Sequence, residues 1–485
     1  MNQASAFCDD VLGDRDCVAL AELIRSGEAS AKEIVEAAIN RAQAVNPALN
    51  AIVALDFEQA LAAAQKHQVR SDDSVFAGLP TFIKDNEQVQ GLPTRLGSRA
   101  TIDRVATRSS KFVEDFMALG LINMGKSTLP EFGLTATTES LLNDATRNPW
   151  NTDYSCGGSS GGSAALVAAG VVPIAHGNDG GGSIRIPASC CGLVGLKSTR
   201  GRLTALHGTE ALPINIVHQG VLTRSVRDTA AFFAAAEKIY RNPNLPAIGH
   251  VKHPGKNRLR IGFFTNHPNG EAIHPECREV ALGAARLCEK LGHKIDEIRS
   301  PVDASMESSF KTYWMMLAFS MQHFSRRSLG YSLTKGQFEP LTCGLSKLFL
   351  KNFYKAPLAI RRLRAKAHEI SAIYQQYDIL LSPVQAHPTP EIGQLSSYID
   401  AEATLRKLSS FVPFTQEHNV TGAPAISLPM GACQHGLPLG VQFSTAFGQD
   451  KQLLEFALEI EEASNWPRMG KSLLSHSMPY QARVP

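Results

Sequence analysis

Apolar side chains recur along the chain with two periods, one helical and one strand-like. Residues 17–45 repeat apolar positions every three to four residues, which predicts two helices. Ser30 with Glu33 three residues later predicts a capping box at the start of the second helix, and Asn46-Pro47 is expected to end it. Short apolar runs predict buried strands at 51–54, 80–83, 121–124 and 171–175. Helical patterns at 59–67, 112–119 and 164–169 separate these strands, which is typical of an α/β sheet with parallel elements.

The pattern changes after about residue 240, where Pro243, Pro246 and Pro254 mark a break. Residues 303–376 are predicted to be mainly helical, and we expect this insertion to shape the mouth of an active site. Within it, the Met-rich stretch 313–321 is predicted to be core rather than a substrate wall. Returning strands are predicted at 379–382, 425–429 and 440–443, followed by a closing helix at 453–460.

Composition excludes several classes of protein. The 485 residues are 44% hydrophobic and only 19% charged, which excludes a disordered chain. A net charge of +3 gives no basic footprint for nucleic acid, and no apolar run is long enough for a membrane span. The first 15 residues lack the pattern of a signal peptide. Nine irregularly spaced cysteines are expected to be free thiols in the cytoplasm, without a bound metal.

Glycine is concentrated in two clusters, at 157–163 (Gly-Gly-Ser-Ser-Gly-Gly-Ser) and at 179–187 (Asp-Gly-Gly-Gly-Ser-Ile-Arg-Ile-Pro). Glycine lets the backbone approach a ligand and direct N–H groups at an anion, although two tight turns with serine caps would have the same composition. The phosphate-binding pattern GxxxxGK[ST] is absent. The first cluster matches GxSxG around Ser159, which leaves open an esterase with a histidine base.

A serine nucleophile needs a base, and a buried lysine with a lowered pKa can supply one. Lys84, at the end of an apolar run, is such a candidate. It precedes Ser159 by 75 residues, and Ser159 precedes Ser183 by 24. These residues and both glycine clusters together resemble the amidase signature family. The resemblance extends over most of the chain and includes 46–50, 91–99, 130–133, 146–150, 419–430 and 436–442.

This resemblance implies an α/β fold with a large mixed β-sheet flanked by helices on both faces. It also implies one amidase domain over residues 1–485, with 303–376 inserted in it. Ser183 would be the nucleophile that forms an acyl-enzyme. Ser159, in a non-proline cis peptide, would relay protons between Ser183 and a neutral Lys84. No cofactor is implied. Backbone N–H groups would form the oxyanion hole at Gly180, Gly181, Gly182 and Ser183.

Other residues near the motifs have less certain roles. Asp179 and Arg185 are expected to hold the second glycine loop together. Whether neighbouring side chains line the pocket stays open for Cys156, Asn178, Cys343, His418, Glu131 and Trp150. Gly180 stands where many family members have threonine, which predicts a roomier floor beside the nucleophile. The sequence Asn178 to Ser183 is similar to amidases related to the 6-aminohexanoate cyclic-dimer hydrolases.

The resemblance implies an amidase that hydrolyses the C–N bond of a small, linear amide, without nucleic acid or membrane as partner. Three alternatives stay open. They are the glutaminase-type A subunit of an amidotransferase complex, an esterase, and an inactive binding protein on the same fold. Ile186 argues against the A subunit, because glutamine is common there in that branch. The sequence is compatible with a homodimer and determines no oligomeric state.

Overall fold

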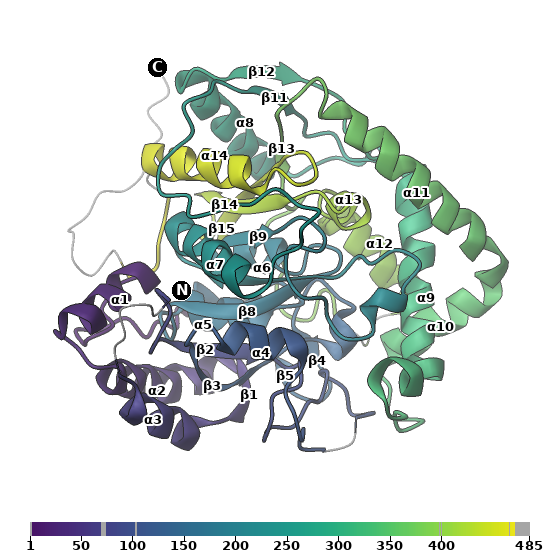
Figure 1. Ribbon diagram of the computed structural model, residues 1–485. Coiled ribbons are helices and arrows are strands. Elements are labelled where there is room, and N and C mark those ends of the chain that lie inside the picture. The colour runs from purple at the N-terminus through teal and green to yellow at the C-terminus, as the bar shows by residue number, and fades with distance from the viewer. Residues whose placement is uncertain are drawn as a thin grey trace.

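The computed structural model describes residues 2–68, 74–101, 104–396, 398, 400–464 and 466–470. Its largest sheet has eight strands in the order β12-β11-β13-β15-β14-β9-β10-β8 (Figure 1). Strand β11 pairs in parallel with β12 and β13, and the other neighbours are antiparallel, so the sheet is mixed as predicted. The strands are β8 (Ile174–Asp179), β9 (Val194–Lys197), β10 (His218–Thr223), β11 (Arg260–Phe263), β12 (Lys294–Glu297), β13 (Ile379–Pro383), β14 (Ala425–Ala432) and β15 (Pro438–Ser444).

A second sheet of three strands adjoins the edge of the first at β8. It contains β1 (Ile52–Leu55), β2 (Pro80–Lys84) and β3 (Ile122–Ser127) in the order β1-β3-β2. The Thr81 hydroxyl on β2 donates a hydrogen bond to the Ile174 carbonyl on β8 (3.0 Å). The carboxyl ends of β2 and β8, with Lys84 and Asp179, are thereby brought to one place. Four short strands follow, namely β4 (Glu139–Ser140), β5 (Asp144–Ala145), β6 (Arg147–Asn148) and β7 (Asn151–Ser155).

Helices cover both faces of the sheets (Figure 1). Helices α5 and α6, which begin within the two glycine clusters, pack on each other and on the sheet, while α7 and α14 pack together against β9, β10 and β14. The apolar side chains between these helices and the sheets form one continuous core, which also includes side chains of the N-terminal helices. The helices outside the insertion are α1 (Cys17–Ser26), α2 (Ala31–Leu49), α3 (Phe57–Lys66), α4 (Lys111–Met117), α5 (Gly161–Ala168), α6 (Arg185–Cys191), α7 (Val226–Ile239), α8 (Pro275–Lys290), α12 (Ala401–Phe411), α13 (Gln416–Thr421) and α14 (Asp450–Ala463).

Residues 303–376 are mainly helical, as the pattern predicts. They form α9 (Ala304–Leu329), α10 (Pro340–Asn352) and α11 (Ala356–Ile373), with a short 3₁₀ turn at Phe353–Lys355. Helix α9 packs against both α10 and α11, and the three helices stand along one edge of the molecule (Figure 1). Side chains of α9 therefore reach the interior from the side.

Two local predictions are wrong. Helix α2 does not end at Asn46-Pro47 but runs through Pro47 to Leu49. It ends only after Leu49, where Asn50 adopts a left-handed conformation and donates its N–H to the Asn46 carbonyl (2.7 Å). The predicted strand at 171–175 begins only at Ile174. The capping box at Ser30 and Glu33 is present as predicted. Among the described residues, no helix has the length and hydropathy needed to cross a membrane.

Candidate active site

Lys84 is the last residue of β2 and is completely buried. Its ammonium nitrogen Nζ lies within hydrogen-bond distance of three neutral groups: Asn178 Oδ1 (2.7 Å), Ser159 Oγ (2.8 Å) and Ser160 Oγ (2.9 Å). Burial lowers the pKa of Lys84 from 10.5 to about 7, against the opposing effect of the Asp179 charge. At neutral pH a large fraction of Lys84 is therefore an uncharged amine, which can accept a proton.

The first glycine cluster brings Ser159 to Lys84. The peptide bond between Gly158 and Ser159 is cis, as the family resemblance implies. The backbone here is too crowded for side chains, since a Cβ at Gly158 would lie 2.6 Å from the Thr137 carbonyl oxygen. A Cβ at Gly161 would lie 2.3 Å from the Thr138 hydroxyl. The glycines therefore allow α5 to begin directly behind Ser159.

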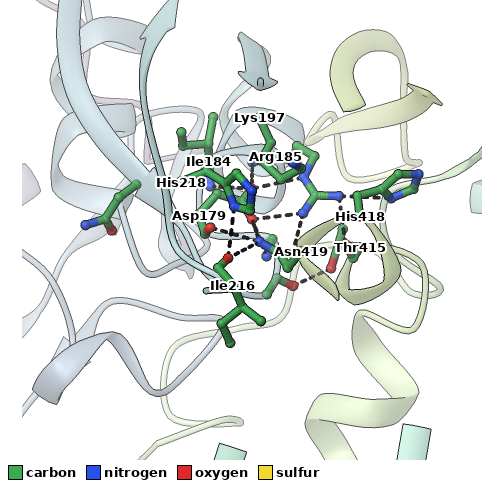
Figure 2. Close-up of polar contacts among 12 residues, drawn as sticks. Asp179, Ile184, Arg185, Lys197, Ile216, His218, Thr415, His418 and Asn419 are labelled. Carbon is green, nitrogen blue, oxygen red and sulfur yellow. Dashed lines mark hydrogen bonds and ion pairs between the residues drawn. The ribbon is translucent and has the colours of Figure 1, made fainter. Parts of the chain in front are cut away.

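The second glycine cluster follows β8 and is held by a buried ion pair (Figure 2). Asp179 accepts hydrogen bonds from the N–H groups of Gly182 (2.8 Å) and Ile184 (3.2 Å) and from both Nε and Nη2 of Arg185 (2.9 and 2.8 Å). Burial alone would raise the pKa of Asp179, but the Arg185 guanidinium outweighs it and holds that pKa well below its usual range. The prediction that this pair organises the loop is confirmed.

The same pair ties the loop to distant segments of the chain. Arg185 donates to the Thr415 carbonyl (2.8 Å), Gln442 Oε1 (2.7 Å) and Asn419 Oδ1 (2.8 Å), and Asn419 Nδ2 donates back to Asp179 (2.8 Å; Figure 2). The position of the loop is therefore determined by contacts with α13 and β15, more than 200 residues away in sequence.

The loop offers N–H groups around Ser183, with one difference from the prediction. The Gly182 N–H is used by Asp179. Within the described part of the chain, the N–H groups of Gly180, Gly181 and Ser183 donate no hydrogen bond. Gly182 has a φ of +130°, and a Cβ there would lie 2.5 Å from Thr415 Oγ1. A side chain at position 182 would therefore be both strained and crowded, so this loop conformation requires glycine.

Ser159 and Ser183 line one cavity of about 750 Å³, together with Lys84, Asn178 and Gly180. The two glycine loops are joined by a hydrogen bond from the Ser160 N–H to the Ser183 carbonyl (3.3 Å). Only 3% of Ser159 and 7% of Ser183 is exposed, so both serines are shielded from bulk water. A Cβ at Gly180 would make only ordinary contacts, the nearest at 3.6 Å, which agrees with a roomier floor.

Part of the cavity wall comes from the loop 204–212, which the sequence does not single out. Another part comes from residues 86–88, 94, 96 and 108–111, of which Thr94 and Leu96 lie in the 91–99 segment that resembles the family. The prediction that 313–321 is core is wrong for one face of α9, since Trp314, Leu317 and Met321 line the cavity. Tyr313, on the other face, is buried and donates its hydroxyl to the Ile214 carbonyl (2.7 Å). Because the stretch is helical, one of its faces lines the cavity and the other is buried in the core.

Ser183 also lines a smaller apolar pocket of about 80 Å³. Its lining includes Phe310 and Trp314 of α9, Leu405 and Leu408 of α12, and Gly181. Lys84 and Ser159 line the large cavity and not this pocket. Ser183 therefore lines both the apolar pocket and the larger cavity that contains the lysine.

The structure separates the side chains whose roles the sequence left open. Asn178 contacts Lys84, whereas four others have structural contacts outside the two cavities. Glu131 accepts the Glu339 N–H at the start of α10 (3.0 Å), and Trp150 Nε1 donates to the Cys191 carbonyl (2.9 Å). The Cys156 thiol donates to the Thr146 carbonyl (3.3 Å), and His418 lies against Arg185 (3.3 Å). Cys343 also lies outside both cavities, near Gln322 (3.7 Å).

Comparison with known proteins agrees with this geometry. The family model Amidase matches residues 33–454. The chain is 46% identical to a protein of Mycobacterium leprae (strain TN) named as the amidase AmiC, covering 97% of this chain and 99% of that one. It is 36% identical to the 6-aminohexanoate-cyclic-dimer hydrolase of Pseudomonas sp. (strain NK87), covering 96% and 97%. A solved structure of 6-aminohexanoate cyclic dimer hydrolase superimposes with a TM-score of 0.85 at 33% identity, covering 95% and 98%.

The fold and these relatives define a hydrolase that acts on carbon–nitrogen bonds. The chain belongs to the amidase signature family, whose chemistry is amide hydrolysis.

Proposed function

We propose that this protein hydrolyses a linear carboxamide through an acyl-enzyme on Ser183. The observation that carries the proposal is the buried Lys84, which contacts Ser159 at 2.8 Å in the same cavity as Ser183. Neutral Lys84 would take a proton from Ser159 while Ser159 takes the proton of Ser183. The Ser183 oxygen would then attack the amide carbonyl.

The negative charge that develops on the carbonyl oxygen would be stabilised by the N–H groups of Gly180, Gly181 and Ser183. One such donor is typically worth about 3–4 kcal/mol of transition-state stabilisation. When the tetrahedral intermediate collapses, the C–N bond breaks and the proton held by Lys84 passes through Ser159 to the leaving nitrogen. Water would then hydrolyse the ester on Ser183 by the same relay in reverse, and the carboxylic acid would leave.

The two pockets suggest how the substrate lies. The leaving nitrogen must be close to its proton donor, and both Ser159 and Lys84 line the large cavity. The amine part would therefore occupy the large cavity, and the acyl part would enter the apolar pocket between Trp314 and Leu408. Because the two parts diverge from Ser183, the arrangement favours a linear amide with a short apolar acyl chain. We also propose that the helical segment 303–376, which supplies Trp314, is an insertion within one amidase domain.

A direct test uses a fluorophosphonate probe followed by peptide mapping. We expect the adduct on Ser183, and Ser183→Ala should lose amide hydrolysis while its melting temperature stays near that of the wild type. An adduct on Ser159 would instead favour the esterase alternative. That alternative has less support, since the hydroxyl of Ser159 contacts a lysine.

The substrate orientation has its own test. Leu408→Trp fills the apolar pocket, so kcat/KM should fall at least tenfold for hexanamides and change little for acetamides with the same amine. Leu317→Trp, a matched change in the large cavity, should instead discriminate among amines. If both variants respond to the amine and neither to the acyl chain, the proposed orientation is wrong.

Two further experiments address the remaining alternatives. A panel that includes cyclic amides would decide between linear and cyclic substrates. Co-purification with a partner subunit would favour the amidotransferase alternative.

A further inference from the structure

The hydrogen-bonding capacity of Lys84 limits how its three contacts can be made. A charged ammonium has three N–H donors and no acceptor, whereas a neutral amine has two N–H donors and one lone pair. All three neighbours of Nζ lie at 2.7–2.9 Å, so each is within hydrogen-bond distance. In the neutral form, two neighbours must accept from Lys84 and the third must donate to it.

Two of the three neighbours can only accept. Asn178 Oδ1 is a carbonyl oxygen and has no proton to give. The Ser160 hydroxyl already donates its proton to the Asn178 main-chain carbonyl (3.1 Å), and it accepts the Asn178 N–H (3.2 Å). Its remaining capacity toward Lys84 is as an acceptor. Ser159 is therefore the neighbour whose O–H can meet the lone pair.

We propose that Asn178 and Ser160 are positioning residues that occupy both N–H groups of neutral Lys84 and so direct its lone pair at the Ser159 hydroxyl. The inference rests on the proposed function, because it concerns how Lys84 acts as the base. It assigns Asn178 a role beyond packing. It also gives the direction of the first proton transfer, from Ser159 Oγ to Lys84 Nζ, with the two accepted hydrogen bonds left intact.

Charged and titratable groups face Lys84 from several elements, and none of them contacts Nζ. His176 and Asp179 lie on β8, Glu87 follows β2 and Lys126 lies on β3. The loop before α5 presents only serine hydroxyls. Asp179 is paired with Arg185, and burial lowers the pKa of His176 to about 3, so it stays uncharged at neutral pH. Position 178 is thus where a new charge would act on Lys84 at contact distance.

Asn178→Asp tests the proposal with little change in shape. Within the described part of the chain, Asn178 Nδ2 has no hydrogen-bond partner, so the substitution breaks no hydrogen bond. A carboxylate at 2.7 Å favours the charged form of Lys84 and raises its pKa. We expect the acidic limb of kcat/KM to move at least one pH unit higher, with much of kcat recovered at alkaline pH.

The matched control is Asn123→Asp on β3, where Oδ1 accepts the Gly125 N–H (3.3 Å) and does not contact Lys84. It should leave the acidic limb in place. Asn178→Leu, which removes the acceptor, should lower kcat at least tenfold with little change in KM, and it serves if the aspartate variant does not fold. An unshifted limb in folded Asn178→Asp, or an unchanged kcat in folded Asn178→Leu, would overturn the proposal. The proposed function is checked separately, since it fails if Lys84→Ala keeps full activity.

Discussion

Lys84→Met is expected to abolish activity and, at neutral pH, to make the protein more stable. Lowering the pKa of a lysine from 10.5 to about 7 corresponds to about 5 kcal/mol of unfavourable free energy of folding at pH 7. Methionine fills a similar volume without a charge to desolvate. It also leaves the Asn178 carbonyl oxygen without its donor, which costs about 1–3 kcal/mol. The net gain is therefore about 3 kcal/mol at pH 7.

This gain has a defined dependence on pH. The folded state binds fewer protons than the unfolded state between about pH 7 and 10.5, so wild-type stability rises with pH across this window. The advantage of Lys84→Met should be largest below pH 7, shrink as the pH rises, and become a disadvantage near pH 10, where only the lost hydrogen bonds count. At about 2.1 cal/mol/K of unfolding entropy per residue, 3 kcal/mol corresponds to roughly 3 °C in melting temperature.

The assay is thermal unfolding of the wild type and the variant at several pH values between 6 and 10, at one fixed scan rate. Lys126→Met is a matched control, because Lys126 is equally buried but forms an ion pair with Asp85 (2.6 Å). Removing one partner of a buried pair costs about 3–5 kcal/mol, so this control should melt at a lower temperature than the wild type. If Lys84→Met were destabilised as much as Lys126→Met at pH 7, the assigned charge state of Lys84 would be wrong.

Three further substitutions test the second glycine loop. Asp179→Asn leaves the Arg185 charge buried without its partner, and we expect a loss of about 3–5 kcal/mol in the free energy of unfolding by urea, together with loss of activity. An equally stable variant would contradict the organising role of the pair. Gly182→Ala meets Thr415 and a φ of +130°, so it should destabilise by about 1–3 kcal/mol, whereas Gly180→Ala should fold like the wild type. Equal melting temperatures for the two alanine variants would contradict the conclusion that position 182 is crowded and position 180 is not.

The local sequence pattern was sufficient to predict those elements whose signal lies entirely within their own residues. The five residues of β2 are all buried, and the run Pro80–Ile83 predicts that strand without any knowledge of its neighbours. The capping box of α2 is similarly local. The boundary at Pro47 was predicted wrongly, because the helix end depends on the left-handed conformation of Asn50 and not on proline alone.

The sequence alone indicated the class of this protein, because Lys84, Ser159, Ser183 and both glycine clusters together resemble the amidase signature family. Only the tertiary structure determined which groups surround these residues and which hydrogen bonds they form. The contact of Asn178 with Lys84, the contact of α13 with the ion pair that uses the Gly182 N–H, and the α9 side chains that line the large cavity all join distant segments. Local periodicity carries no information on such contacts, because they depend on how β2, β8 and α9 are brought together by the packing of the whole core.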